Sequence, residues 1–390
     1  MQNPLNRFPP VEKYCNFGHN GPMESKTAVI GAGAWGTAVA KIVADKGNDV
    51  VLWSLEEDNR DDVNVRHENR RYLPGVKLPE NLRATSDIVE AASDRDFVVL
   101  AVPSLYLLQT ARRMLSVRAI QEGKTAIAVI TKGFLQTDKG PRLIVETLED
   151  YLPGFYRHSL VYISGPSHAE EVSLGRITGL IAASESARNA LRFRDLLKGK
   201  GIFVFPSLDV RGVQVAAAVK NVIAIAFGMM DAFRAPNTGT SARASDENVL
   251  DITGQFGDGT ESLLLAAGLN EIQSLGMAMG ATHPETFTSI AGIGDLDVTC
   301  RSVFGRNRRF GREIIEKRIL EPFKSIEHLL ERIQDIGYLP EGVAAAKHVR
   351  QLAERLGLSL PISVGLYQIL NREIEPSEFL RRLFERFGLT

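Results

Sequence analysis

The sequence predicts an α/β domain with a doubly wound, mostly parallel sheet, followed by an all-helical domain. Short apolar runs alternate with helical patterns as far as about residue 207, and only helical patterns follow. The segment 213–227 is apolar on every face, which is typical of a helix buried in a protein interior. The 390 residues are enough for two domains, each with its own core.

Composition excludes several classes of protein. The chain is 44% hydrophobic and 24% charged with a net charge of -1, so nothing indicates a nucleic-acid or membrane partner. Cys15 and Cys300 cannot build a disulfide framework and lack zinc-site spacing, so we expect no metal and a reducing, cytoplasmic compartment. Residues 1–24 have no apolar core of a signal peptide and are expected to form a flexible leader.

A glycine motif opens the first domain. The apolar run KTAVI (26–30) leads into GAGAWG, so Gly31, Gly33 and Gly36 form a G-x-G-x-x-G fingerprint between an expected strand and an expected helix at 35–46. A strand at 48–53 completes the β-α-β unit. The glycines allow a tight turn, close approach to a pyrophosphate and close helix packing, in that order. Residues 25–207 are therefore predicted to be a Rossmann-like dinucleotide-binding domain.

Acidic residues follow the second expected strand, where NAD enzymes hold the ribose 2′-hydroxyl. The candidates are Glu56 and Glu57, and no arginine precedes Arg60. A carboxylate there would repel a 2′-phosphate, which favours NAD and leaves NADP possible. The alternative is that both glutamates are solvated loop residues.

Chemically suggestive residues stand at the ends of later strands. Strands are expected at 96–102, 126–131, 160–164, 179–183 and 202–206, with helices at 105–115 and 142–151. Lys132 and the run Gly165 to His168 follow two of these strands, and ligands bind outside the carboxyl ends of strands in such sheets. His168, an isolated histidine in a turn, is assigned no chemistry.

The all-helical domain is expected over 208–390, with helices at 263–279, 309–318, 325–337, 341–356 and 376–387. Its first helix carries Lys220 and Asn221 within the apolar run. A buried ammonium must be paired, lose its proton or take part in chemistry. A membrane span is rejected because this pair interrupts the run and Arg211 and Asp231 lie near its ends. A lysine whose head reaches solvent from a core helix is the other interpretation.

Six motifs follow one another along the chain. They are GAGAWG, HENRRYLPGVKLPENL (67–82), TKG from residue 131, GPSHAEEV from 165, VKN from 219, and AGIGDLDVTC followed by GRNRRFG. Together they resemble the NAD(P)-dependent glycerol-3-phosphate dehydrogenase family, from about Thr27 into the final helices. The resemblance implies hydride transfer between NAD(H) or NADP(H) and the pair dihydroxyacetone phosphate and sn-glycerol 3-phosphate. It also implies supply of phospholipid synthesis and a homodimer.

The resemblance further implies roles for particular residues. Lys220 would be the proton donor and acceptor, with Asn221, Asp295 and Thr299 completing the catalytic cluster. Lys132, Gly165, Ser167 and Lys220 would line the substrate site, and Arg306 and Asn307 would hold the substrate phosphate. Cofactor contacts would come from Gly31, Gly33, Trp35, Gly36, Glu56, Lys132, Ala169, Arg306, Leu339 and Glu341. We expect Lys132 and Arg306 to lower the pKa of Lys220 and Asp295 to hold its ammonium.

Two alternatives and two departures remain. A related two-domain β-hydroxyacid or ketone reductase would not need the phosphate clamp of Arg306 and Asn307, and a non-catalytic dinucleotide-sensing protein would not need Lys220 and Asp295. Residues 234–255 are extra relative to the family pattern and are expected to form a long loop near the cleft or a subunit contact. The segment GDGTE carries Gly259 and Glu261 where the family has asparagine and lysine.

Overall fold

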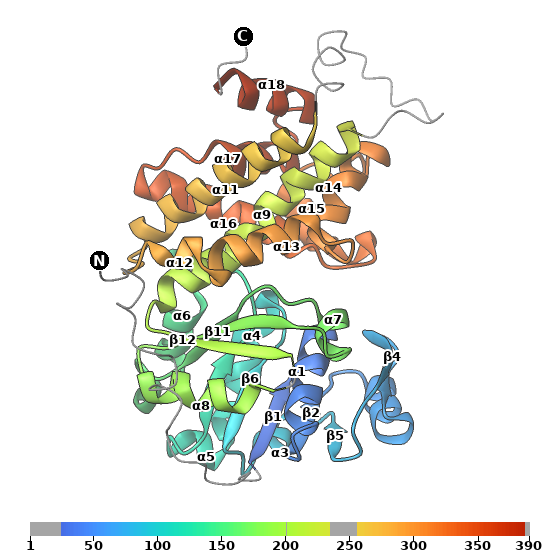
Figure 1. The fold of residues 1–390 in the computed structure, drawn as a ribbon, viewed down its shortest axis with the longest axis vertical. Coiled ribbons are helices and arrows are strands. Elements are labelled where there is room, and N and C mark those ends of the chain that lie inside the picture. The colour runs from blue at the N-terminus through green and yellow to red at the C-terminus, as the bar shows by residue number, and fades with distance from the viewer. Residues whose placement is uncertain (1–24, 200, 235–255, 387–390) are drawn as a thin grey trace, which may run out of the picture.

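A computed structural model describes residues 25–199, 201–234 and 256–386, which form a part with a large sheet and a helical part (Figure 1). The large sheet has the strand order β12-β11-β10-β7-β6-β1-β2-β5, and every neighbouring pair is parallel except β10 and β11. Its strands are β1 (Lys26–Ile30), β2 (Asp49–Trp53), β5 (Leu82–Thr85), β6 (Phe97–Leu100), β7 (Ala126–Val129), β10 (Val161–Ser164), β11 (Thr178–Ala183) and β12 (Ile202–Ser207). The predicted α/β fold is confirmed.

Helices cover both faces of this sheet, which explains why its strands read as continuous apolar runs. Alternate residues of β1 face opposite sides, so Ala28 and Ile30 join one hydrophobic core and Val29 joins the other. The core around Val29 includes residues of α1 (Ala34–Ala44), α7 (Ala169–Ser173) and α8 (Ala187–Leu197). The opposite core includes residues of α3 (Ile88–Ala92), α4 (Ser104–Arg113), α5 (Arg118–Gln121) and α6 (Ile144–Tyr151).

Several short elements escaped sequence analysis. β5 adds an eighth strand, and two antiparallel hairpins pair β3 (Glu68–Asn69) with β4 (Leu73–Lys77) and β8 (Phe134–Thr137) with β9 (Gly140–Leu143). The helix expected at 142–151 begins at Ile144 because β9 occupies the residues before it. The remaining short helices here are α2 (Glu57–Asp61), a π turn at Asp62–Arg66, and 3-10 turns at Met114–Ser116 and Gly154–Tyr156.

The described residues after β12 contain helices and no strand. These helices are α9 (Val210–Arg234), α11 (Asp258–Ala278), α12 (Glu285–Thr288), α13 (Asp295–Arg301), α14 (Arg306–Glu316), α15 (Ile326–Glu331), α16 (Glu341–Leu356), α17 (Pro361–Leu370) and α18 (Pro376–Arg386), with a π turn at Ile290–Gly294. The helix expected at 325–337 is divided into α15 and a 3-10 turn at Ile333–Ile336. The sequence prediction missed α17, whose first turn is capped by Glu271: its carboxylate accepts bonds from the backbone N–H groups of Ile362 and Ser363.

Helix α9 is shared by the two parts. Val210, Val213 and Ala217 pack in the core on one face of the sheet, whereas the helix from Ile223 to Met230 lies in the core of the helical part. Figure 1 shows α9 passing from the boundary between the sheet part and the helical part, called the seam below, into the middle of the surrounding helices. Its length and apolarity would suffice to cross a membrane, but the whole apolar window is buried inside the protein. The sequence prediction of a buried core helix is confirmed.

Close approach of α14 to α9 depends on two glycines. A Cβ on Gly228 would lie 1.9 Å from the Arg308 carbonyl oxygen, and one on Gly311 would lie 2.0 Å from the Ile225 carbonyl oxygen. The backbones of the two helices therefore touch directly.

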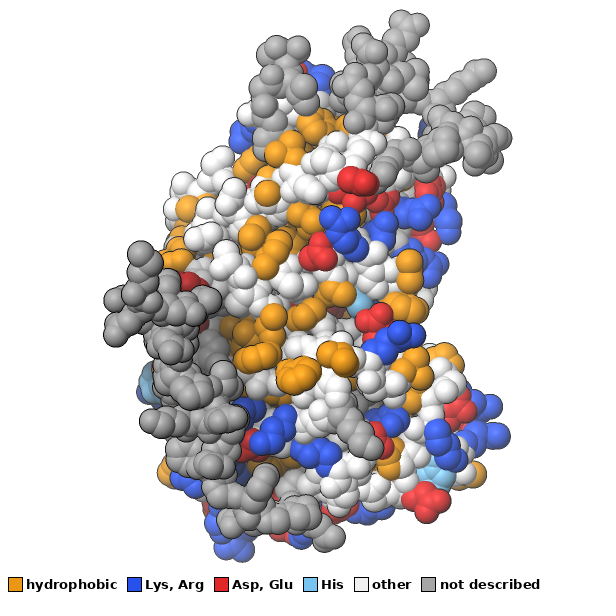
Figure 2. Space-filling model, in the orientation of Figure 1, with side chains coloured by type: hydrophobic (Ala, Val, Ile, Leu, Met, Phe, Trp, Pro, Cys, Tyr) orange, Lys and Arg blue, Asp and Glu red, His pale blue; other side chains and the backbone are white. Residues whose placement is uncertain are grey.

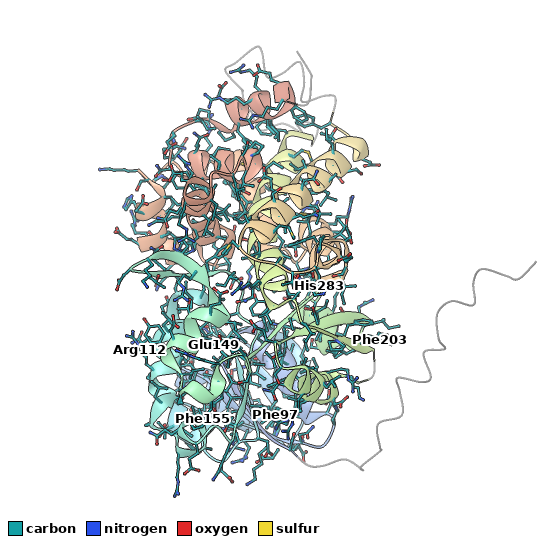
Figure 3. All side chains as sticks on the ribbon, turned by 90° about the vertical axis from the view of Figure 1, so that its left-hand side faces the viewer. Phe97, Arg112, Glu149, Phe155, Phe203 and His283 are labelled. Atoms are coloured by element: carbon teal, nitrogen blue, oxygen red, sulfur yellow. The ribbon has the colours of Figure 1, made fainter. Side chains whose placement is uncertain are left out.

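The seam between the two parts is visible from two sides. The space-filling outline is indented at the seam on its right-hand side (Figure 2). In the view turned by 90°, His283 marks the seam, and Arg112 of α4 and Phe203 of the edge strand β12 lie on opposite sides of the sheet part (Figure 3).

Candidate active site

A buried ion pair lies at the seam. Lys220 comes from the middle of α9, and its Nζ donates to Oδ1 of Asp295, the first residue of α13. The two side chains are only 4% and 1% exposed. The lysine therefore does not extend its head to bulk solvent, and the interpretation of a solvent-reaching core lysine is wrong.

The second oxygen of Asp295 binds donors from the sheet part. Oδ2 accepts from Nζ of Lys132 at 3.3 Å and from the hydroxyl of Ser164 at 3.1 Å. Lys132 follows β7 and Ser164 ends β10, so the carboxyl ends of neighbouring parallel strands meet a helix of the other part. One carboxylate thus holds two cations, and the cluster joins both parts of the chain.

The charge states follow from this geometry. Burial lowers the pKa of Lys220 to about 7, because the ammonium has lost its water; Asp295 opposes this shift and Lys132 adds to it. Burial would raise the pKa of Asp295, but Lys132 and Lys220 outweigh it and lower that pKa. Arg306, which we expected to act on Lys220, is not among the main contributors.

A chain of amide hydrogen bonds runs beside the ion pair. Asn307 Nδ2 donates to Asn221 Oδ1 at 3.0 Å, and the Gly342 N–H donates to Asn307 Oδ1 at 2.9 Å. Both asparagines are buried. The chain joins α9, α14 and the start of α16. The Asn307 amide nitrogen carries two hydrogens and donates one of them to Asn221, so the other can bind a ligand.

Arg306 opens α14 and is exposed. Within the described part of the chain its guanidinium takes part in no hydrogen bond or ion pair, unlike Arg308 and Arg309, which pair with Asp231 and Glu313. The first N–H groups of α14 also lack helical partners, which favours an anion at this end. The arrangement can bind a phosphate.

The remaining substrate candidates lie on the turn after β10. Gly165 has φ +131°, and a Cβ there would lie 2.6 Å from the Gly179 carbonyl oxygen, so the turn needs glycine. The Ser167 hydroxyl donates to the Gly165 carbonyl at 3.0 Å. His168 lies 3.5 Å from the Val298 carbonyl oxygen, and burial lowers its pKa. The Thr299 hydroxyl donates to the Asp295 carbonyl at 2.6 Å and so supports the first turn of α13.

The glycine loop after β1 has the shape of a dinucleotide cradle. Gly31 has φ +126°, and a Cβ on Gly36 would lie 2.0 Å from the Gly31 carbonyl oxygen, so both positions exclude a side chain. A Cβ on Gly33 would meet nothing within 4 Å, which leaves open space above the start of α1. Since β1 is flanked by β2 on one side and β6 on the other, this loop lies at the switch point of the sheet. The residues fit a pyrophosphate.

Two further contacts shape the cofactor side. Asn69, fully buried in the hairpin that sequence analysis missed, donates to the Ala32 carbonyl at 2.8 Å and to the Thr37 hydroxyl at 2.7 Å, which fixes the glycine loop. Glu56 follows β2 and accepts from the Tyr72 hydroxyl at 2.8 Å. Its carboxylate is therefore held by the protein, in contrast to a solvated loop glutamate.

The other cofactor candidates surround this loop and the seam. Trp35 is half-buried on α1, and Ala169 is buried at the start of α7. Leu339 and Glu341 are half-buried at the start of α16. Burial raises the pKa of Tyr162 well above its ordinary value, and the charges of Glu341 and Asp295 add to this.

Some sequence expectations fall elsewhere. Gly257, Asp258 and Thr260 form the start of α11, where the Gly257 N–H donates to the Thr260 hydroxyl, and Glu261 pairs with Arg301 at 2.9 Å. The leader 1–24 and the insertion from residue 235 to 255 lie outside the described residues. The sequence marks Ser164 only as the end of a strand and Asn69 only as part of a motif. Strand periodicity, which places Ser164 on the same face as Tyr162, is the one signal for Ser164.

Comparisons with known proteins agree for both the sheet part and the helical part of the chain. The family model for the N-terminus of NAD-dependent glycerol-3-phosphate dehydrogenase matches residues 26–190, and the model for its C-terminus matches residues 209–381. The glycerol-3-phosphate dehydrogenase (NAD(P)+) of Treponema denticola is 51% identical over 369 residues, covering 93% of this chain and 99% of the relative. That of Bacillus subtilis is 36% identical over 345 residues, covering 88% and 90%.

A solved structure extends the likeness to the fold. The structure of glycerol-3-phosphate dehydrogenase from Coxiella burnetii has a TM-score of 0.76 and 30% identity, and the match covers 94% of this chain and 100% of that one. These matches favour neither alternative raised from the sequence. The dinucleotide cradle, the buried lysine at the seam and both family models agree, and the chain belongs to the NAD-dependent glycerol-3-phosphate dehydrogenase family.

Proposed function

We propose that Lys220 is the proton donor and acceptor as this NAD(P)-dependent oxidoreductase interconverts dihydroxyacetone phosphate and sn-glycerol 3-phosphate. Bound NAD(H) or NADP(H) would supply the hydride that adds to C2 of the ketone. The Lys220 ammonium gives its proton to the oxygen at C2 during reduction, and the neutral amine takes the proton back during oxidation. One observation carries the proposal: Lys220 is buried against Asp295 at the seam, and its pKa is lowered to about 7, which suits both directions.

The neighbours of Lys220 have separate tasks in this proposal. Lys132 would be a cation beside the oxygen on which negative charge develops, and such donors lower the barrier by about 3 kcal/mol each. Asp295 keeps the ammonium in place and offsets part of its desolvation. Asn221 and Thr299 complete the cluster by holding Asn307 and the start of α13.

The phosphate of the substrate is assigned to the start of α14. Arg306 is exposed with no ion-pair partner among the described residues, and the planar guanidinium can donate two bonds to one phosphate. Asn307 has one donor left, and Lys132, Gly165 and Ser167 line the opposite side from the sheet part. A carboxylate substrate would not need this clamp, which supports a phosphorylated ketone.

The cofactor is assigned to the glycine loop and the seam. Gly31, Gly33 and Gly36 would hold the pyrophosphate, and Glu56 would accept bonds from the ribose hydroxyls, with NAD preferred over NADP. Its bond from Tyr72 supports that preference because it keeps the carboxylate beside the end of β2. The other residues assigned to the cofactor are Trp35, Lys132, Ala169, Arg306, Leu339 and Glu341.

The wider setting is also part of the proposal. We place the boundary between a dinucleotide domain (25–207) and a substrate domain (208–390) at the start of α9. The enzyme would work in the cytoplasm as a homodimer and supply glycerol 3-phosphate for phospholipid synthesis.

Replacement of the lysine tests the assignment. Lys220→Ala should lose at least about 100-fold in turnover with dihydroxyacetone phosphate, since a positioned acid or base contributes about that much or more, while NADH still binds. Lys124→Ala, which removes an exposed lysine paired with Glu122, is the matched control and should behave as wild type. Unphosphorylated dihydroxyacetone should be a poor substrate. Substantial turnover by Lys220→Ala would remove the assignment.

A further inference from the structure

The Asp295 carboxylate is held by three side chains of unequal kind. Lys220 binds Oδ1, whereas Lys132 and Ser164 share Oδ2. Ser164 is the one neutral donor to this carboxylate among the described residues, and it is 3% exposed. The proposed reaction assigns tasks to both lysines but leaves this hydroxyl without one.

The position of Ser164 is fixed on the sheet side of the seam. It is the last residue of β10, where its neighbour Ile181 of β11 pairs with it in register, and the glycine turn at Gly165 follows at once. Its hydroxyl donates across the seam to a helix 131 residues further along the chain. The bond therefore orients Asp295 relative to the rigid sheet.

A hydroxyl serves this position better than a third cation. Lys132 also has to face the substrate, and if its ammonium turns away from Oδ2, only the Ser164 hydroxyl remains on that oxygen. The bond keeps the carboxylate from rotating, so Oδ1 stays on the Lys220 ammonium. Another positive charge would hold the carboxylate equally well but would lower the pKa of Lys220 further.

We propose that Ser164 is a positioning residue that holds Asp295 Oδ2, so that Oδ1 faces Lys220 and keeps its ammonium available for proton donation. The inference rests on the proposed role of Lys220. In this role Ser164 acts through Asp295, to which its hydroxyl donates, and not directly on the substrate or the cofactor. Its loss should therefore change the rate and the pH dependence of the reaction more than substrate affinity.

The test compares Ser164→Ala with Ser164→Thr, which keeps the hydroxyl. For dihydroxyacetone phosphate reduction at pH 7, kcat of Ser164→Ala should fall about tenfold, the loss expected for one bond to a charged group, with little change in KM. The basic limb of its pH profile should move to lower pH, because a poorly held Asp295 stabilises the Lys220 ammonium less. Ser164→Thr should recover most of the rate and return the limb toward the wild-type position.

Controls separate this inference from a packing effect and from the proposed function. Ser184→Ala removes another buried serine, whose hydroxyl accepts from the Ser186 N–H after β11, and should match wild type. The inference is wrong if Ser164→Ala has the wild-type rate and profile, or if Ser164→Thr is equally impaired. Lys220→Ala, measured in the same series, separates the two proposals. Turnover by Lys220→Ala refutes the proposed function. An inactive Lys220→Ala together with a Ser164→Ala that behaves as wild type refutes only the role of Ser164.

Discussion

Asp295→Asn should move the pH dependence of ketone reduction to lower pH. The substitution keeps the shape of the side chain and an oxygen for Lys220, but removes the negative charge that raises the pKa of that lysine. Two unit charges about 4 Å apart interact by about 4 kcal/mol at an effective dielectric constant of about 20, which corresponds to about three pKa units. Without the carboxylate, burial and Lys132 would act unopposed and lower the pKa of Lys220 well below 7.

The sign of the effect on catalysis follows directly. In the proposed reaction, reduction needs the ammonium of Lys220, so its rate should fall as pH rises through the lysine pKa. At pH 7 about half of the lysine is protonated when its pKa is about 7, and about one part in a thousand when the pKa is three units lower. We therefore expect kcat for reduction at pH 7 to drop by several hundred-fold, on the order of 10²–10³.

The assay is the initial rate of NADH oxidation with saturating dihydroxyacetone phosphate, measured across the pH range in which the variant stays folded. Asp297→Asn, which removes an exposed carboxylate paired with Arg301 on the same helix, should keep the wild-type profile. Lys132→Met should shift the basic limb the opposite way, to higher pH, because Lys132 lowers the pKa of Lys220. A basic limb of Asp295→Asn at or above the wild-type position would refute the reasoning.

Further substitutions test the phosphate clamp, the cofactor choice and the helix packing. Arg306→Ala should raise KM for dihydroxyacetone phosphate about tenfold or more. Arg309→Ala removes an exposed arginine from Glu313, which keeps its contacts with Lys317 and Tyr338, and should leave KM unchanged; equal KM values in the two variants would contradict the clamp. Glu56→Ala should lower the ratio of kcat/KM with NADH to kcat/KM with NADPH. An unaltered ratio would show that this glutamate has no part in the choice of cofactor. Gly311→Ala should lower the free energy of unfolding by about 1–3 kcal/mol, since its Cβ would lie 2.0 Å from the Ile225 carbonyl oxygen; denaturation in urea at the wild-type midpoint would contradict it.

The fold followed from the sequence because its signals are local. The continuous apolar strands and the long apolar run of α9 each reflect burial that a short window of sequence records, and the glycine motif marks the turn at Gly31. The edge strand and the two hairpins did not, because segments such as LRAT, LPGVK and GPRL contain charged residues, glycine or proline and lack the continuous apolar run of the central strands. Helix α17 was missed for a different reason: the carboxylate that caps it, Glu271, lies about 90 residues away in the chain.

Some features of the candidate site could likewise be predicted from local sequence, and others could not. Burial of Lys220 could be read from its neighbours, and its need for a counter-charge follows from desolvation, but the identity of Asp295 came from the family resemblance. The Ser164 bond to Asp295 and the Asn307 bond to Gly342 join residues far apart in sequence. The first bond depends on how the helical part sits on the sheet part and the second on how α14 packs beside α16, and no local pattern encodes either placement.

The passage of α9 through both cores means that the two parts are not interchangeable modules. A chain cut after Ser207 would uncover the face of the sheet against which Val213 and Ala217 pack, and a chain begun there would carry that apolar end into water. Neither fragment should be stable and soluble alone, because each would expose apolar surface to water. A chimera would have to exchange the sheet face together with the first turns of α9. The helix that carries Lys220 thus also couples the packing of one half of the chain to that of the other.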